Sequence, residues 1–225
     1  MLATVRSSAA PPTKKIFGNN KKRMTTHSAR KAQMDWITPE TLLSEIADGN
    51  LVLSTPKEAA RGMLIYDIRL NEAPIRLKLA MGDDITVAFE PSSWNNTETS
   101  RKTLTFNAPD IVLAAAAELE DWCRQVLEDK HPHVQSMWTS AVKPADKYQG
   151  KLRTKITLEG PRAARFYDET AQPTVAPDTL QGRSVQAVVQ VRGIYVQKQG
   201  VGLMLDTTDV KIGPPVIKQP VCPFD

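Results

Sequence analysis

The chain has 225 residues, of which 41% are hydrophobic, with 29 basic against 25 acidic side chains. This composition excludes a chain that is disordered throughout, and it suits one large or two small globular domains. No run approaches the roughly 18 apolar residues that span a bilayer, and we expect no secretory signal. Two cysteines without CxxC spacing provide neither a disulfide framework nor a metal-ligand set, so we expect a soluble protein of a reducing, intracellular compartment.

The positive charge is concentrated at the start of the chain. Residues 1–34 hold eight basic side chains and no acid, and removing these eight from the 29 leaves 21 basic against 25 acidic residues. A basic arm on an acidic body is typical of a protein that meets a polyanion locally. A disordered solubilising leader and an organelle transit peptide stay open as alternatives. The predicted phosphate contacts of the arm are Lys14, Lys15, Lys21, Lys22 and Arg23.

Ordered structure is expected from about residue 35 onward. Thr38 can cap a short helix with Pro39 at its first position, and Gly49 ends it. Short runs rich in β-formers then alternate with turn residues, which predicts a series of strands. These strands are expected at 51–55, 63–70, 75–80, 85–90 and 102–106.

One long helix is predicted at about 110–130. Asp110 is the expected N-cap, and His131-Pro132 ends the helix because proline disfavours helical geometry in the residue before it. Apolar residues recur at helical spacing along one face, which indicates a buried stripe. Its members are Val112, Ala116, Leu119, either Trp122 or Cys123, and Val126.

The last third of the chain returns to strands, expected at 151–158, 163–168, 184–197 and 201–210. In the first of these, polar and apolar residues alternate with Thr154 as the exception. Gly193 suggests a bulge after which the facing of the strand changes. The predicted fold class is mainly β (α+β): a β-rich N-terminal part, an inserted long helix at about 110–130 and a β-barrel over 35–212, followed by a flexible tail at 213–225.

Nothing in the sequence indicates catalysis. His27 lies in the arm, and His131 and His133 lie in a helix-ending turn, so no metal site or histidine-activated nucleophile follows from spacing. No phosphate-binding loop or dinucleotide fingerprint is present. We therefore expect a protein that is not an enzyme and that uses no metal and no cofactor.

Cations and aromatic residues are interleaved between Lys143 and Tyr167, where only two acids occur. Cations that follow phosphates and rings that stack on unpaired bases are what a single nucleic-acid strand requires. The alternative is a solvated face, with Phe166 in the core and Tyr167 outside. A second basic strip lies on the strand at 184–197. The predicted nucleic-acid contacts are Lys147, Tyr148, Lys151, Arg153, Lys155, Arg165, Phe166, Arg192, Tyr195 and Lys198.

Four segments in succession carry a resemblance: DKYQGKLRTKI at 146–156, RFYD at 165–168, VQAVVQVRGIYV at 185–196 and VGLMLDTTDV at 201–210. Their pattern and order resemble the oligonucleotide-binding region of single-stranded DNA-binding proteins from large eukaryotic DNA viruses and related replication proteins. The resemblance implies an OB-fold-like β-barrel that coats exposed template. The positions that would carry this function are Tyr148, Lys151, Arg153, Lys155, Phe166, Arg192 and Tyr195.

The sequence therefore predicts a non-catalytic single-stranded DNA-binding protein of replication, recombination or repair. RNA is an alternative ligand, and a virion or scaffold protein whose basic arm binds a packaged genome is the alternative class. Expected partners also include replication proteins, through the C-terminal tail, and further copies of the chain, but no membrane. The expected location is the nucleus or a viral replication site in the cytoplasm, with organelle targeting as an alternative.

Overall fold

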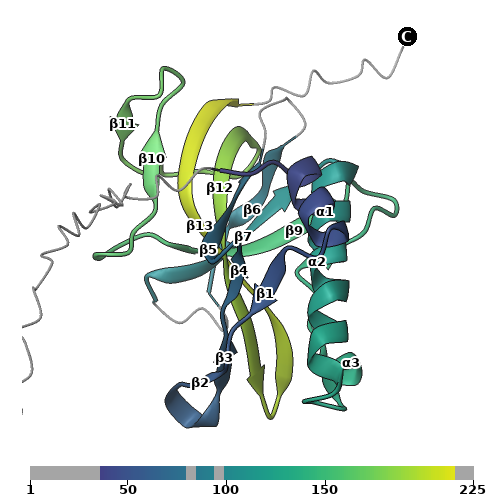
Figure 1. Cartoon of the computed structure of the whole chain (residues 1–225). Helices are drawn as coiled ribbons and strands as arrows, with labels where there is room; N and C mark the ends of the chain where they lie inside the picture. The colour runs from purple at the N-terminus through teal and green to yellow at the C-terminus, as the bar shows by residue number, and fades with distance from the viewer. Residues whose placement is uncertain (1–35, 80–84, 94–98, 216–225) are drawn as a thin grey trace, which may run out of the picture. The chain divides into compact units, whose positions relative to one another are not determined.

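The computed structural model describes residues 36–79, 85–93 and 99–215. It is a mainly β, α+β fold in which a few helices accompany one large mixed sheet (Figure 1). The helices are α1 (Pro39–Ala47), α2 (Asp110–Glu128) and α3 (Val134–Met137), with a 3-10 turn at Ala60–Gly62. The strands are β1 (Leu51–Leu53), β2 (Lys57–Glu58), β3 (Leu64–Tyr66), β4 (Ile68–Leu70), β5 (Ala73–Leu79), β6 (Thr86–Ser92), β7 (Arg101–Asn107), β8 (Val142–Lys143), β9 (Lys151–Thr157), β10 (Arg165–Tyr167), β11 (Pro173–Thr174), β12 (Arg183–Gln197) and β13 (Gly200–Pro215).

Five of these strands close into a ring. β6 pairs with β7, β7 pairs with β9, and β9 runs parallel to β13. β13 then pairs with β12, which returns to β6 where Ser184 lies opposite Thr86. If the five strands are numbered along the chain, their order around the ring is first, second, third, fifth and fourth. This Greek-key ring is a barrel of the OB-fold kind, and the predicted fold class is confirmed.

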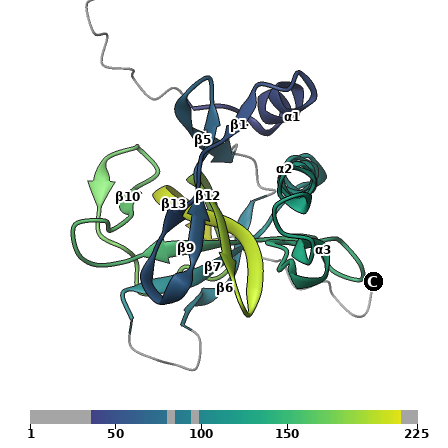
Figure 2. The ribbon, with the colours of Figure 1, turned by 60° about the horizontal axis from the view of Figure 1, so that its bottom comes forward.

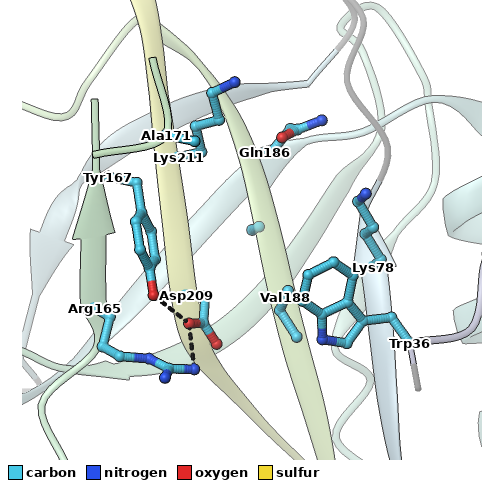
Figure 3. Close-up of a pocket in the computed structure, with 10 residues that line it drawn as sticks. Trp36, Lys78, Arg165, Tyr167, Ala171, Gln186, Val188, Asp209 and Lys211 are labelled. Atoms are coloured by element: carbon cyan, nitrogen blue, oxygen red, sulfur yellow. Dashed lines mark hydrogen bonds and ion pairs between the residues drawn. The ribbon is translucent and has the colours of Figure 1, made fainter. Parts of the chain in front are cut away.

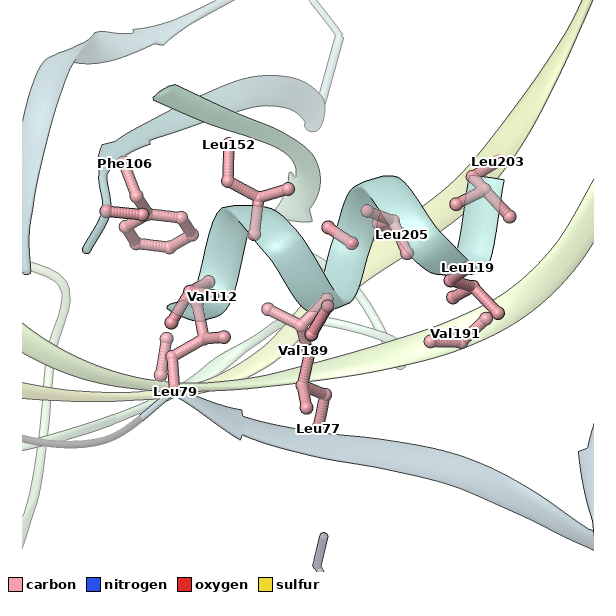
Figure 4. Packing of buried hydrophobic residues seen from close by; sticks show 14 of the residues in the cluster. Leu77, Leu79, Phe106, Val112, Leu119, Leu152, Val189, Val191, Leu203 and Leu205 are labelled. Atoms are coloured by element: carbon pink, nitrogen blue, oxygen red, sulfur yellow. The ribbon is translucent and has the colours of Figure 1, made fainter. Parts of the chain in front are cut away.

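Helix α2 lays its apolar stripe against the barrel (Figure 4). Val112 and Leu119 are buried as predicted. The stripe continues through Cys123 to Leu127, so the prediction for Val126 is wrong. Each fully buried aliphatic side chain stabilises the fold by roughly 1.5–3 kcal/mol. The strand residues seen beside the helix in Figure 4 include Leu77, Leu79, Phe106, Leu152, Val189, Val191, Leu203 and Leu205.

The N-terminal elements extend the barrel sheet. β5 pairs with β12, and β4 and β1 continue the sheet outward from β5. Figures 1 and 2 both show α1 beside α2, with the β10–β11 hairpin on the opposite side of the barrel. Because β5 pairs with β12, the first strands belong to the same sheet as the barrel. None of the described helices is long and apolar enough to cross a membrane.

Strand β12 contains the bulge that Gly193 suggested. The register with β13 shifts between Val191 and Gly193, so Arg192 has no partner opposite it. Gly193 has φ +142, and a Cβ there would lie 2.0 Å from the carbonyl oxygen of Tyr66, so only glycine fits. Residue facing changes here as predicted: Val191 is buried before the bulge and Ile194 after it.

Three of the departures from the predicted boundaries change how an element begins, divides or ends. Pro109, and not Asp110, is the N-cap of α2, and it makes no side-chain capping bond. The single strand expected at 63–70 is divided into β3 and β4, because β3 pairs with β12 and β4 pairs with β1 and β5. The last strand continues beyond residue 210, because β13 keeps pairing with β12 as far as Pro215.

Candidate nucleic-acid interface

Strand β9 directs a column of cations to the outside of the barrel. Buried and outward residues alternate strictly along it. Thr154, the exception in the sequence pattern, faces inward and shares a hydrogen bond of 2.8 Å with Thr207 of β13. The polar threonine therefore satisfies its hydroxyl inside the barrel and does not interrupt the alternation. The outward side chains are those of Lys151, Arg153 and Lys155.

Strand pairing brings further cations beside this column. Lys155 lies next to Asp206 of β13 in the parallel pairing. The Asp206 carboxylate accepts hydrogen bonds from Arg101 at 2.6 Å and from Arg192 at 3.4 Å. Five cations against one carboxylate leave this surface positive. We call it the cationic face, and its cations are Arg101, Lys151, Arg153, Lys155 and Arg192.

The pKa of Lys155 reflects the positive surroundings of the face. Partial burial, followed by the charges of Arg101 and Arg153, lowers the pKa of its ammonium group from the ordinary 10.5, and Asp206 acts in the opposite direction. The ammonium group also donates a hydrogen bond of 2.8 Å to the Thr103 hydroxyl. A bound phosphate would relieve the repulsion among these cations, so the face is suited to a polyanion.

Two exposed aromatic rings flank the cationic column. The Lys151 ammonium group lies 5.9 Å from the ring centroid of Phe89 and 5.8 Å from that of Tyr148. Phe89 is 54% exposed and Tyr148 is 78% exposed, so both rings have free surface. Such cation–π contacts hold the rings near the cation while leaving faces open for stacking.

Phe89 is a candidate that the sequence pattern missed. Ile85 and Val87 are buried, so strict alternation would bury Phe89 as well. The register between β6 and β7 shifts between Val87 and Phe89, which sets Phe89 opposite Thr105 and turns its ring outward. A bulge of this kind has no marker in the residues 85–90.

Arg153 is held in position from outside its own strand. Its backbone N–H donates to the Ala141 carbonyl at 2.8 Å, and its guanidinium donates to the Ser140 carbonyl. Buried Glu120 of α2 in turn accepts hydrogen bonds from the Ala141 backbone N–H at 2.6 Å and from the Ser140 hydroxyl at 2.7 Å. Helix α2 therefore orients a guanidinium on the cationic face through the segment 140–141.

The other predicted contacts are distributed over the surface. Lys147 and Tyr148 are exposed in the loop before β9, and Lys198 is exposed in the turn between β12 and β13. Arg192 joins the cationic face through Asp206. Tyr195 is half-buried, and its hydroxyl lies against Gly202. A β-carbon added at Gly202 would be only 3.1 Å from the Tyr195 hydroxyl oxygen. Its ring is therefore partly covered by its own sheet.

The prediction for Phe166 is wrong. Its side chain is 5% exposed, because Phe166 lies opposite Val210 with its ring turned toward the core. Alternation on β10 places Arg165 and Tyr167 outside instead, which is the alternative that the sequence left open. The aromatic residue that β10 offers to a ligand is therefore Tyr167.

Arg165 and Tyr167 border a pocket of about 370 Å³ on the outer face of β5, β12, β13 and β10 (Figure 3). The Asp209 carboxylate accepts from the Arg165 guanidinium at 2.6 Å and from the Tyr167 hydroxyl at 3.4 Å. On the opposite side, the Lys78 ammonium group lies 5.0 Å from the ring centroid of Trp36. We call this cavity the Trp36 pocket, and its lining includes Trp36, Lys78, Arg165, Tyr167, Asp209 and Lys211.

Several predicted features lie outside the described residues. The arm cations Lys14, Lys15, Lys21, Lys22 and Arg23 are among them, as is the chain after Pro215. Among the residues that are described, no group of three or more His, Cys, Asp and Glu side chains is placed to hold a metal ion.

No protein-family model matches the sequence. No curated protein matches it either. Among solved structures, the chain is similar to a single-stranded DNA binding protein encoded by bacteriophage T7, with a TM-score of 0.46 and 8% identity over 66% of this chain and 91% of that one. It is also similar to the single-stranded DNA-binding protein of bacteriophage Enc34. For the C-terminally truncated Enc34 protein the TM-score is 0.43 and the identity 12%, over 72% of this chain and 96% of that one. For the Enc34 protein in complex with ssDNA the TM-score is 0.39 and the identity 12%, over 72% and 97%.

Proposed function

We propose that this chain binds single-stranded DNA on the cationic face and coats exposed strands in replication, recombination or repair, without catalysing a reaction. One observation carries the proposal: the column Lys151, Arg153 and Lys155 stands beside the exposed rings of Phe89 and Tyr148. β7 and β9 are the second and third strands of the ring, and OB folds use the face of those strands to bind oligonucleotides.

The aromatic residues support a single strand over a duplex. Rings such as those of Phe89 and Tyr148 stack on bases only where the bases are unpaired, and each stacked base contributes about 1–3 kcal/mol. The cations interact with phosphates of either form. The combination therefore favours unpaired DNA, with RNA as the ligand to be compared in the experiment.

The position of the cations supports strand coating over the virion or scaffold alternative. A capsid subunit needs its positive charge mainly in an arm, whereas Arg153 and Lys155 lie on the barrel itself. The proposal extends to replication proteins as partners through the tail at 213–225, to further copies of the chain, and to the nucleus or a viral replication site. Kinship with the proteins of large eukaryotic DNA viruses stays a prediction.

Fluorescence anisotropy of a labelled dT oligomer tests the proposal. Duplex DNA and an RNA oligomer serve as competitors across a salt series, and the full chain is compared with a version that starts at Met34. We expect tight, salt-sensitive binding of the single strand that survives removal of the arm. The double variant Arg153→Ala with Lys155→Ala should bind on the order of 100-fold more weakly at low salt. Its slope of log affinity against log salt should fall by about 1.4, because each phosphate contact to a single strand contributes about 0.7.

A matched control removes two exposed cations elsewhere, Lys57 of β2 and Arg69 of β4, by alanine. This control changes the net charge equally and should bind the strand as the unaltered chain does. Binding that disappears with the arm, or that treats duplex and single strand alike, would contradict the proposal and favour the virion or scaffold alternative. Equal losses in both double variants would show that only net charge matters.

A further inference from the structure

The Trp36 pocket is separate from the cation column of β9 and has its own pair of aromatic residues. Trp36 and Tyr167 stand on opposite sides of it, with Val188 of β12 between them (Figure 3). Trp36 is 52% exposed, and Lys78 lies over its ring. The volume of about 370 Å³ is in the range of cavities that hold small organic ligands.

The charges around the pocket suit a phosphate-bearing ligand. Asp209 is the lining acid, and it is already held by Arg76 at 3.0 Å and Arg165 at 2.6 Å. Lys78 and Lys211 form no salt bridge within the described residues and line the same cavity. A positive rim around apolar and aromatic walls is complementary to a nucleotide, whose base is flat and whose phosphate is anionic.

Asp209 also orients the wall on which a base would rest. Its carboxylate accepts from the Tyr167 hydroxyl and from the Arg165 guanidinium, which keeps both side chains on the β10 side of the pocket. Its second oxygen accepts from the Arg76 guanidinium and the Thr208 hydroxyl. A carboxylate with this many donors acts as a positioning group, so the ring of Tyr167 is held ready for contact.

Strand pairing connects the pocket to the cationic face. Asp206 at the edge of the cationic face and Asp209 in the pocket are three residues apart on β13. The outward row through Asp206 continues to Gln190 of β12, and the neighbouring row through Asp209 continues to Val188 and then Lys78 of β5. A strand bound on the cationic face can therefore continue along β13 into the pocket without leaving the sheet surface.

We propose that the Trp36 pocket is a second contact site for the same DNA strand and takes one unpaired base, stacked against Trp36 and Tyr167, with Lys78 and Lys211 on its phosphates. The inference rests on the proposed function, because the strand that fills the pocket is the one bound by the cationic face. The half-buried Gln186 side chain also lines the pocket and supplies both a donor and an acceptor to the edge of a base.

Photocrosslinking locates the base directly. The full chain is bound to a dT oligomer in which one thymine at a time is replaced by 5-iodouracil, and crosslinked peptides are identified by mass spectrometry. We expect crosslinks to Trp36 or Tyr167 from some positions of the oligomer and to Phe89 or Tyr148 from others. In a length series from about 4 to about 16 nucleotides, the pocket crosslinks should require the longer oligomers.

The paired affinity measurement compares the double variant Trp36→Ala with Tyr167→Ala against Trp36→Phe with Tyr167→Phe, which keeps both rings. The alanine variant should bind a long dT oligomer about 5- to 140-fold more weakly, and the phenylalanine variant should remain close to the unaltered chain. Crosslinks confined to Phe89 and Tyr148, together with unchanged affinity of the alanine variant, overturn the pocket site and leave the proposed function standing. A chain that neither binds nor crosslinks to the oligomer overturns both.

Discussion

The cationic face and the Trp36 pocket adjoin each other on β12 and β13 but hold their charges differently. On the cationic face, Lys151, Arg153 and Lys155 form no salt bridge within the described part of the chain. At the pocket, Asp209 accepts from both Arg165 and Arg76, so these two guanidinium groups share one carboxylate. Both surfaces therefore combine cations that attract phosphates with rings that can stack on bases, but only in the pocket does an acid hold a ring in place, through the hydrogen bond from the Tyr167 hydroxyl to Asp209.

Removing both rings of the cationic face should weaken DNA binding strongly. The double variant Phe89→Ala with Tyr148→Ala loses two stacking contacts of at least about 1 kcal/mol each, so its affinity for a dT oligomer should fall about 25-fold or more. The slope of log affinity against log salt should stay unchanged, because no phosphate contact is lost. Anisotropy titrations across a salt series measure both quantities.

The control for this variant exchanges the two rings, Phe89→Tyr with Tyr148→Phe, and should bind almost as the unaltered chain does. If the alanine variant lost affinity only through a smaller salt slope, the rings would act by positioning Lys151 and not by stacking on bases. The proposed stacking of bases on the cationic face would then be wrong.

The two aspartates should respond differently to replacement by asparagine. Asp209 and its partner Arg76 have side chains only 12% and 15% exposed, so Asp209→Asn should lower the free energy of unfolding by about 1–3 kcal/mol. Arg101 and Arg192 beside Asp206 are 51% and 42% exposed, so Asp206→Asn should lower it by less than about 1 kcal/mol. Urea unfolding of each variant measures the difference.

Asp206→Asn should have the larger effect on DNA binding, although it has the smaller effect on stability. Asp206→Asn removes the acid of the cationic face and should strengthen binding of a dT oligomer by about two- to fivefold. Asp209→Asn releases Arg165 and Tyr167 from the pocket wall and should not strengthen it. Equal stability losses, or a stronger complex from Asp209→Asn than from Asp206→Asn, would remove the distinction between the surfaces.

The pH dependence of the cationic face should be the smallest effect. Because burial and the neighbouring arginines lower the pKa of Lys155 below 10.5, the unfolded chain binds more protons than the folded one between the lowered pKa and 10.5. The contribution of Lys155 to stability therefore rises with pH across that window. A bound phosphate raises the pKa again, so affinity for DNA should fall as the pH rises through the same window.

Lys155→Arg provides the comparison, since an arginine stays charged throughout this range. The affinity of this variant for DNA should change less with pH than that of the unaltered chain when anisotropy is measured toward pH 10.5. Parallel curves for the two proteins would show that Lys155 does not contact phosphate in its charged form.

Local patterns predicted the parts of the fold that depend on neighbours in sequence. Thr38 caps α1 by accepting from the Thr41 backbone N–H at 3.3 Å, and alternation on β9 correctly separated Arg153 and Lys155 from the core. Such features follow from backbone geometry over a few residues. Phe89 and Phe166 escaped the same reasoning, because a bulge turned the first outward and pairing with β13 turned the second inward.

By itself the sequence determined the mainly β class, the long helix and the cationic column, because these depend on periodicity that each segment carries alone. Only the tertiary structure decided which surfaces meet. The Trp36 pocket joins Trp36, Lys78, Tyr167 and Asp209 from segments far apart in the chain. Their meeting depends on the register of β12 with β5 and of β13 with β10, which is set by long-range pairing and packing of the whole barrel.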